Sequence, residues 1–265
     1  MTQPLYHQIV QKNVPQGKLG LWPLGGGSIA VRSRKILAFV DPFLSNWSSE
    51  DWVRRFPPVF APQAVDTCNL ILLTHEHDDH CDPATIRPIL QNCAPLLVGP
   101  LAAVNRLDTA GVFNGLSAEV RTVGPGEQLQ VGDLKIQSIV THDPLSQGAV
   151  GYLVQSGNTS VLFLGDSLFV DTLLEELSNR HRVDLFVVAL GANTPEDTYY
   201  FSIDDVASAA RIVHPTYVLP IHWDLWTKTF IDPKTHLRNM PDNVILVQRG
   251  EFLFLPLDSK TNTRQ

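Results

Sequence analysis

The chain has 265 residues, of which 44% are hydrophobic, and its formal net charge is −7 at pH 7. This length fits one large domain or two small ones, and this share of apolar residues suffices for a sizeable core. No stripe of lysine and arginine runs along the sequence, which argues against a protein that neutralises many phosphates of a nucleic acid. We therefore expect a globular protein without nucleic-acid partners that acts on a small molecule.

Targeting and redox signals point to the cytoplasm. Residues 1–14 lack a basic flank followed by an apolar core, and eighteen apolar residues never run together, so we expect neither an export signal nor a membrane span. Cys68, Cys81 and Cys93 are an odd number at irregular spacing, which predicts reduced thiols rather than a disulfide framework. The sequence leaves open whether the chain forms a homo-oligomer.

The first part of the chain reads as a meander. Apolar patterning predicts strands over 19–24, 28–31 and 35–40. The triple glycine at 25–27 is interpreted as a turn, because neither a Lys-Ser/Thr pair nor a helix pattern follows it, as a phosphate-binding loop would require. Trp47 and Trp52 then fall in an irregular stretch, where they could line a pocket or cover the core; we favour core cover.

The remainder alternates between strands and helices. A helix begins at Pro83 with Asp82 as its N-cap, and Pro88 should bend or delay it. Further strands are expected over 96–98, from 120, and over 134–140, 151–154, 160–164, 183–190 and 216–221; further helices over 101–107, 172–182 and after Ser202; and a frayed tail over 258–265. This order indicates an α/β (α+β) fold in which two sheets pack face to face with helices outside, forming one domain over 1–265.

A dense cluster of imidazoles and carboxylates follows the apolar run Leu70–Leu73. His75 and His77 are two residues apart, so on an extended chain their side chains point to the same side and can bind one ion. Asp79 and His80 come next and can present ligands to a second ion. A solvated acidic loop would be the better explanation for any single histidine, but this spacing after a buried strand favours a metal site, because imidazole and carboxylate are common metal ligands.

Three other predicted strands also end in His or Asp, at His142, Asp166 and His222. Taken singly, each is more often a loop, core or turn residue than a ligand. Together they complete two coordination sets, with His75, His77 and His142 on one ion, Asp79, His80 and His222 on the other, and Asp166 between them. Paired divalent ions can share a nucleophilic hydroxide and stabilise the oxyanion formed by its attack, so Asp79, Asp166 and His222 are also candidate catalytic residues.

These residues, in this order, resemble the metallo-β-lactamase superfamily. The stretch around Asp41-Pro42-Phe43, the stretch 220–226 and the closing stretch 250–258 look like the branch that includes L-ascorbate-6-phosphate lactonase. The resemblance implies a four-layer αβ/βα sandwich, a dinuclear site between sheet edges and opening of a cyclic ester. It also implies that Asp41 supports the site from behind, as a carboxylate that orients a ligand imidazole; a plain strand-ending aspartate is the competing interpretation.

Four functions remain in view. The leading hypothesis is a metal-dependent hydrolase that opens a small lactone or related ester. A phosphodiesterase on the same two-metal scaffold is the main alternative. A di-iron redox enzyme is disfavoured because Glu is expected where His77 stands, and the seven intact ligands argue against a non-catalytic metal-binding protein.

Metal identity and pocket walls are less determined. Imidazole-rich sites bind zinc more tightly than manganese, whereas the resemblance points to manganese, so either ion fits as the pair of divalent cofactors. Trp223, Asp224, Trp226 and Lys228 follow His222 directly and are candidate pocket walls, although core packing explains the aromatic residues equally well.

Overall fold

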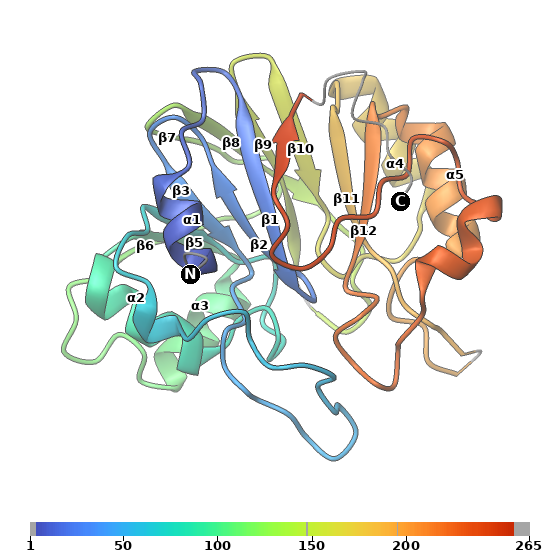
Figure 1. Cartoon of the computed structure of the whole chain (residues 1–265). Coiled ribbons are helices and arrows are strands. Elements are labelled where there is room, and N and C mark those ends of the chain that lie inside the picture. The colour runs from blue at the N-terminus through green and yellow to red at the C-terminus, as the bar shows by residue number, and fades with distance from the viewer. Residues whose placement is uncertain (1–3, 147, 195, 257–265) are drawn as a thin grey trace.

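Two β-sheets face each other at the centre of the protein, and helices cover their outer sides (Figure 1). The computed structural model describes residues 4–146, 148–194 and 196–256. The helices over the first sheet are α1 (Leu5–Gln11), α2 (Pro83–Cys93) and α3 (Leu101–Thr109), and those over the second are α4 (Asp171–Arg180) and α5 (Ile203–Val213). This arrangement confirms the predicted four-layer αβ/βα sandwich.

The first sheet has seven strands in the order β13-β1-β2-β3-β4-β5-β6. Strands β13, β1, β2 and β3 pair antiparallel, and β3 to β6 pair parallel. Their bounds are β1 (Leu19–Gly25), β2 (Ser28–Arg32), β3 (Leu37–Val40), β4 (Leu70–Leu72), β5 (Leu96–Gly99), β6 (Glu119–Thr122) and β13 (Leu253–Leu255).

The second sheet has six strands in the order β12-β11-β10-β9-β8-β7. Because β8 and β10 are both antiparallel to β9, and β10 to β12 pair parallel, the carboxyl ends of β8, β10 and β12 share one edge. Their bounds are β7 (Gln128–Val131), β8 (Leu134–Val140), β9 (Val150–Ser156), β10 (Thr159–Phe163), β11 (Leu185–Ala189) and β12 (Tyr217–Ile221).

The central strands are buried on both faces, which explains their continuous apolar runs. In β10, Val161 and Phe163 face the core between the sheets, whereas Leu162 faces the helices. In β4, Leu70 and Leu72 face the same central core, and Ile71 packs under the helices of the first sheet. The polar residues that follow these strands are therefore delivered to the edge of a rigid, well-packed scaffold.

The predicted elements match the structure with shifts of a few residues at their ends. Pro88 lies inside α2 without ending it, and the 3-10 helices η1 (Pro62–Ala64) and η2 (Pro233–Asn239), like α1, were not expected. The predicted tail over 258–265 lies outside the described residues. Every helix in the described part of the chain is too short or too polar to cross a membrane.

Candidate metal centre

The loop after β4 gathers three imidazoles. His75 and His80 are fully buried, and the side chain of His77 is 31% exposed. The ring centroids lie 4.4 Å apart for His75 and His77, and 4.1 Å apart for His75 and His80. The apolar strand β4 ends just before this loop, so the edge of the first sheet brings the three rings close together.

The second sheet adds Asp166 after β10 and His222 after β12. The Oδ2 atom of Asp166 lies 3.2 Å from His80 Nε2 and 3.8 Å from His75 Nε2, which places this carboxylate between the two rings. His222 Nε2 lies 3.2 Å from His80 Nε2 and 3.1 Å from Asp79 Oδ2. Six of the seven predicted ligands therefore meet in space.

These separations suit divalent ions. Two donors, each about 2.1 Å from one tetrahedral ion, lie about 3.4 Å apart, close to the separations between these atoms. Two groups of possible donors can be distinguished, His75-His77-Asp166 and Asp79-His80-His222. Within each group, the donor atoms lie within 4.8 Å of one another. His75 Nε2 and Asp166 Oδ1 are buried without a hydrogen-bond partner in the described part of the chain, as atoms meant for a cation would be.

Asp41 sets the orientation of two ligand rings. Its Oδ2 accepts hydrogen bonds from His80 Nδ1 at 2.8 Å and from the Thr74 hydroxyl at 2.6 Å. Because the Thr74 hydroxyl donates its only proton to Asp41, it must act as the acceptor for the Nδ1 proton of His75, 2.9 Å away. Both rings then keep Nε2 turned to the site; the orienting role of Asp41 that the resemblance implied requires this geometry and remains a prediction.

Two of the four non-glycine residues with positive φ in the described part of the chain lie at this site. Asp41 and His222 have φ values of +44° and +72°, in the left-handed region that side chains other than glycine avoid. Such conformations cost on the order of 1–3 kcal/mol each and persist where the surrounding structure imposes them. Here they turn two functional side chains toward the site at the ends of β3 and β12.

Charge coupling shifts the pKa values within the cluster. Burial and the neighbouring His80 lower the pKa of His75 well below its usual value. Burial also opposes a charge on His80, but the carboxylates of Asp166, Asp79 and Asp41 outweigh it and raise the pKa of that ring well above its usual value. Asp166 and Asp79 also raise the pKa of His222 against burial, so these carboxylates favour positive charge in this part of the site.

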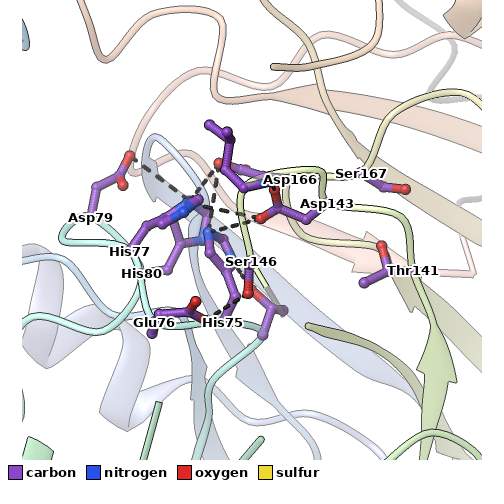
Figure 2. Close-up of polar contacts among 12 residues, drawn as sticks. His75, Glu76, His77, Asp79, His80, Thr141, Asp143, Ser146, Asp166 and Ser167 are labelled. Atoms are coloured by element: carbon purple, nitrogen blue, oxygen red, sulfur yellow. Dashed lines mark hydrogen bonds and ion pairs between the residues drawn. The ribbon is translucent and has the colours of Figure 1, made fainter. Parts of the chain in front are cut away.

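The structure does not bring His142 into the cluster. Its side chain is exposed, its backbone N–H donates to Ser167 Oγ at 3.1 Å, and its carbonyl accepts from the Leu168 N–H at 2.8 Å. Figure 2 shows that Asp143, the next residue, points toward the imidazoles, while Thr141 and Ser167 lie beside the cluster. The predicted ligand role of His142 remains a prediction, and sequence reasoning missed Asp143 altogether.

A cavity of about 260 Å³ opens above the cluster. Trp47 and Trp52 line it and also pack against the small apolar cluster around Phe43, so they serve both as pocket wall and as core cover. Trp226 lines it too, and its Nε1 donates to Asp79 Oδ2 at 2.8 Å. The position of Trp226 just after a ligand histidine was the one sequence signal for this contact.

Comparisons with known proteins show which family and which folds this chain is similar to. The model of the family described as the β-lactamase superfamily domain matches residues 36–223. A curated relative, the "Probable L-ascorbate-6-phosphate lactonase UlaG" of Escherichia fergusonii, is 25% identical over 203 residues. The match covers 69% of this chain and 56% of the relative, so the chain spans little more than half of that protein.

Solved structures share the fold. "Igni18, a novel metallo hydrolase" from the archaeon Ignicoccus hospitalis superposes with a TM-score of 0.67 at 17% identity, covering 91% of this chain and 100% of that chain. A "possible metal-dependent hydrolase" from Veillonella parvula gives a TM-score of 0.74 at 15% identity, covering 90% of this chain and 99% of that chain.

Proposed function

Because the chain belongs to the metallo-β-lactamase superfamily, we propose that it is a metal-dependent hydrolase that opens a small lactone or a related carboxylic ester. The observation that carries this proposal is the convergence of six side chains beside one cavity, with buried donor atoms that lack a hydrogen-bond partner in the described part of the chain: His75, His77, Asp79, His80, Asp166 and His222, of which His77, Asp79 and Asp166 line the cavity. These six residues would hold two divalent ions, with zinc and manganese as the candidates.

Bound divalent ions would lower the pKa of water and stabilise the oxyanion that forms when an ester carbonyl is attacked. The protein supplies the positions. The Trp226 indole donates to Asp79 and holds its carboxylate in one direction. Asp166 lies between His75 and His80 and would help to hold both ions, and His222 would complete the second set. Asp79, Asp166 and His222 are therefore our candidate catalytic residues.

Location and partners follow as expectations of the same proposal. The three cysteines are free, which suits a reducing compartment such as the cytoplasm. The cavity suits a small molecule rather than a macromolecule.

A hydrolysis screen tests this function. The chain would be stripped with a chelator, reloaded with zinc or manganese, and assayed against neutral lactones, aryl esters and a chromogenic phosphodiester. We expect turnover of lactones or esters that chelation removes and that His77→Ala or Asp166→Ala abolishes while circular dichroism stays unchanged. A preference for the phosphodiester would instead identify a phosphodiesterase, and metal binding without turnover of any compound would indicate a non-catalytic protein.

A further inference from the structure

We propose that Asp143, and not His142, is the residue by which the β8 end of the second sheet completes the first metal set. This inference rests on the metal-dependent function proposed above. It assigns to that set two imidazoles, from His75 and His77, and two carboxylates, from Asp143 and Asp166.

The first argument is the position of the Asp143 carboxylate. Its Oδ2 lies 3.8 Å from His75 Nε2 and 3.8 Å from His77 Nδ1, so it is equidistant from the two imidazoles that would share one ion (Figure 2). The side chain is only 4% exposed, and Oδ2 is buried without a hydrogen-bond partner in the described part of the chain. A buried, unpartnered carboxylate oxygen is costly unless a cation or donor occupies the space before it.

The second argument is that this carboxylate is held in place. Its other oxygen, Oδ1, accepts the Leu145 N–H at 2.9 Å, which fixes the side chain in a local turn. Ser146, three residues on, donates to Glu76 Oε2 at 2.6 Å and ties this loop to the histidine loop. Asp143 is thus oriented from both sides toward His75 and His77.

The third argument concerns His142. Its backbone N–H and carbonyl are both engaged, by Ser167 Oγ and the Leu168 N–H, at the point where the chain leaves the sheet. Adjacent residues on an extended chain face opposite ways, so a backbone turn that brought His142 to the inner side would break these bonds and turn Asp143 outward. One of the two residues can face the ions, and the backbone holds Asp143 there.

A metal preference follows from this donor set. Exchanging one imidazole for a carboxylate hardens the site and moves its preference toward manganese or ferrous iron, relative to a three-histidine set. The carboxylate also balances more of the charge of two divalent ions. We therefore expect the advantage of zinc over manganese to be smaller here than in an Asp143→His variant.

Metal binding is the readout that tests Asp143. The stripped chain and its Asp143→Asn, His142→Ala and Asp143→His variants would be dialysed against manganese or zinc, and bound metal counted by mass spectrometry. Asp108→Asn, at an exposed position in α3, is the matched control for loss of one carboxylate charge. Near-UV circular dichroism of each metal-free variant checks that the fold is intact.

We expect Asp143→Asn to weaken metal binding at least about tenfold, His142→Ala and the control to leave it unchanged, and Asp143→His to shift selectivity toward zinc. Loss of metal in His142→Ala, or retention of metal in a folded Asp143→Asn protein, would overturn the assignment. A wild-type chain that binds no metal at all would instead contradict the proposed function.

A second inference comes from the cavity walls: the geometry points to a neutral substrate that carries an aromatic or flat apolar group. It also rests on the proposed hydrolase function. Trp52 meets Trp226 edge-on at 5.8 Å between ring centroids and Tyr199 at 5.4 Å, and Trp47 meets Trp226 at 5.8 Å. These four rings line one continuous part of the cavity, where a planar group can stack or meet ring edges.

The charges around the cavity disfavour an anionic substrate group. Arg106 is the one cationic side chain among the described lining residues, and it is paired with Asp78. Lys228, beside the aromatic wall, is held by Asp197 Oδ2 and the Tyr199 hydroxyl, each at 3.0 Å. Glu76 and Asp78 add negative charge to the lining. A phosphate placed away from the ions would therefore meet no free cation.

Two esters that differ in one charge test this preference: phenyl acetate and 4-acetoxybenzoate. Turnover of each by the metal-loaded chain would be compared, and binding of each to the metal-free chain would be followed by tryptophan fluorescence. We expect phenyl acetate to be favoured at least about tenfold in kcat/KM and in affinity, and Trp52→Ala to raise its KM more than it lowers kcat. Equal or better binding of the anion would overturn the inference, and absence of turnover with preserved binding preference would refute only the hydrolase function.

Discussion

Gly27, in the turn between β1 and β2, leaves the space that the His80 ring occupies. A Cβ atom at this position would lie 2.4 Å from His80 Cε1 and 3.0 Å from His80 Nδ1. Moving the ring away from such a Cβ would break its hydrogen bond to Asp41 at Nδ1. The glycine run, interpreted from sequence as a turn, therefore also shapes the metal centre.

Gly27→Ala should displace His80 and so weaken metal binding at least about tenfold, with overpacking costing about 1–3 kcal/mol of metal-free stability. Equilibrium dialysis and urea unfolding measure the two effects. Gly124→Ala is the control, since its Cβ would meet only Glu127 Oε1, at 3.8 Å. Normal metal affinity in Gly27→Ala would show that His80 is not a ligand.

Asp41→Asn tests the orienting carboxylate. Asp41 Oδ2 accepts two hydrogen bonds and Oδ1 accepts the Thr74 N–H at 2.7 Å, so an amide nitrogen on either side faces a donor. We expect metal affinity to fall about 10- to 100-fold, as for other groups that orient ligand imidazoles. Competition with a fluorescent chelator measures the metal affinity. An unchanged affinity would support the competing interpretation, in which Asp41 only ends a strand and does not orient the imidazoles.

At the level of elements, the ends of the ligand-bearing strands were predictable because apolar runs stop abruptly at polar residues. Leu73 before His75 and Leu164 before Asp166 are such boundaries. The sequence could not tell which residue past the end of β8 turns inward, because hydrogen bonds to Ser167 and Leu168 from another segment decide it. Helix α1 escaped prediction because it has no side-chain cap and is stabilised by burial of Tyr6 and Ile9.

The predicted cap of α5 gives a test at this scale. Ser202 Oγ accepts the Asp205 N–H at 3.2 Å, and Asp205 Oδ2 accepts the Ser202 N–H at 2.9 Å. Ser202→Ala should lower the free energy of unfolding by about 1 kcal/mol. Ser208→Ala, within the same helix, should change it by less than about 0.5 kcal/mol. Urea unfolding of the metal-free chain compares them; equal effects would mean that the cap adds nothing.

At the scale of the whole molecule, the site exists only where the two sheets meet. The first sheet supplies Asp41 and the histidine loop, and the second supplies Asp143, Asp166 and His222. The Thr74 carbonyl accepts the Val150 N–H at 2.9 Å, which joins the two edges beside the ligands. Ions that bridge this junction should therefore stabilise the packing of one sheet on the other, as any ligand of the native state does.

Proton and metal should compete for His80. Its pKa is raised by Asp166, Asp79 and Asp41 against the effect of burial, and the pKa of His222 is raised by Asp166 and Asp79. A divalent ion must displace a proton from each of these rings that carries one. Metal affinity should therefore rise with pH, by about tenfold per pH unit for each proton released, until the raised pKa values are passed. Calorimetric titrations in buffers of different ionisation enthalpy would count the released proton.

The same proton stabilises the metal-free fold. Because the folded pKa of His80 lies above its unfolded value, its contribution is complete below the unfolded pKa of about 6.5 and is lost as pH rises through the folded value. The pKa values of Asp79 and Asp166 are lowered, chiefly by His80 against burial, so their contribution is lost at the acid end instead. The melting temperature of protein stripped of metal by a chelator should thus fall as pH is raised above neutrality. The melting temperature of metal-loaded protein should not fall, because the ions replace the proton as the positive charge among these carboxylates. Parallel pH profiles for the two forms would contradict this exchange of proton for metal.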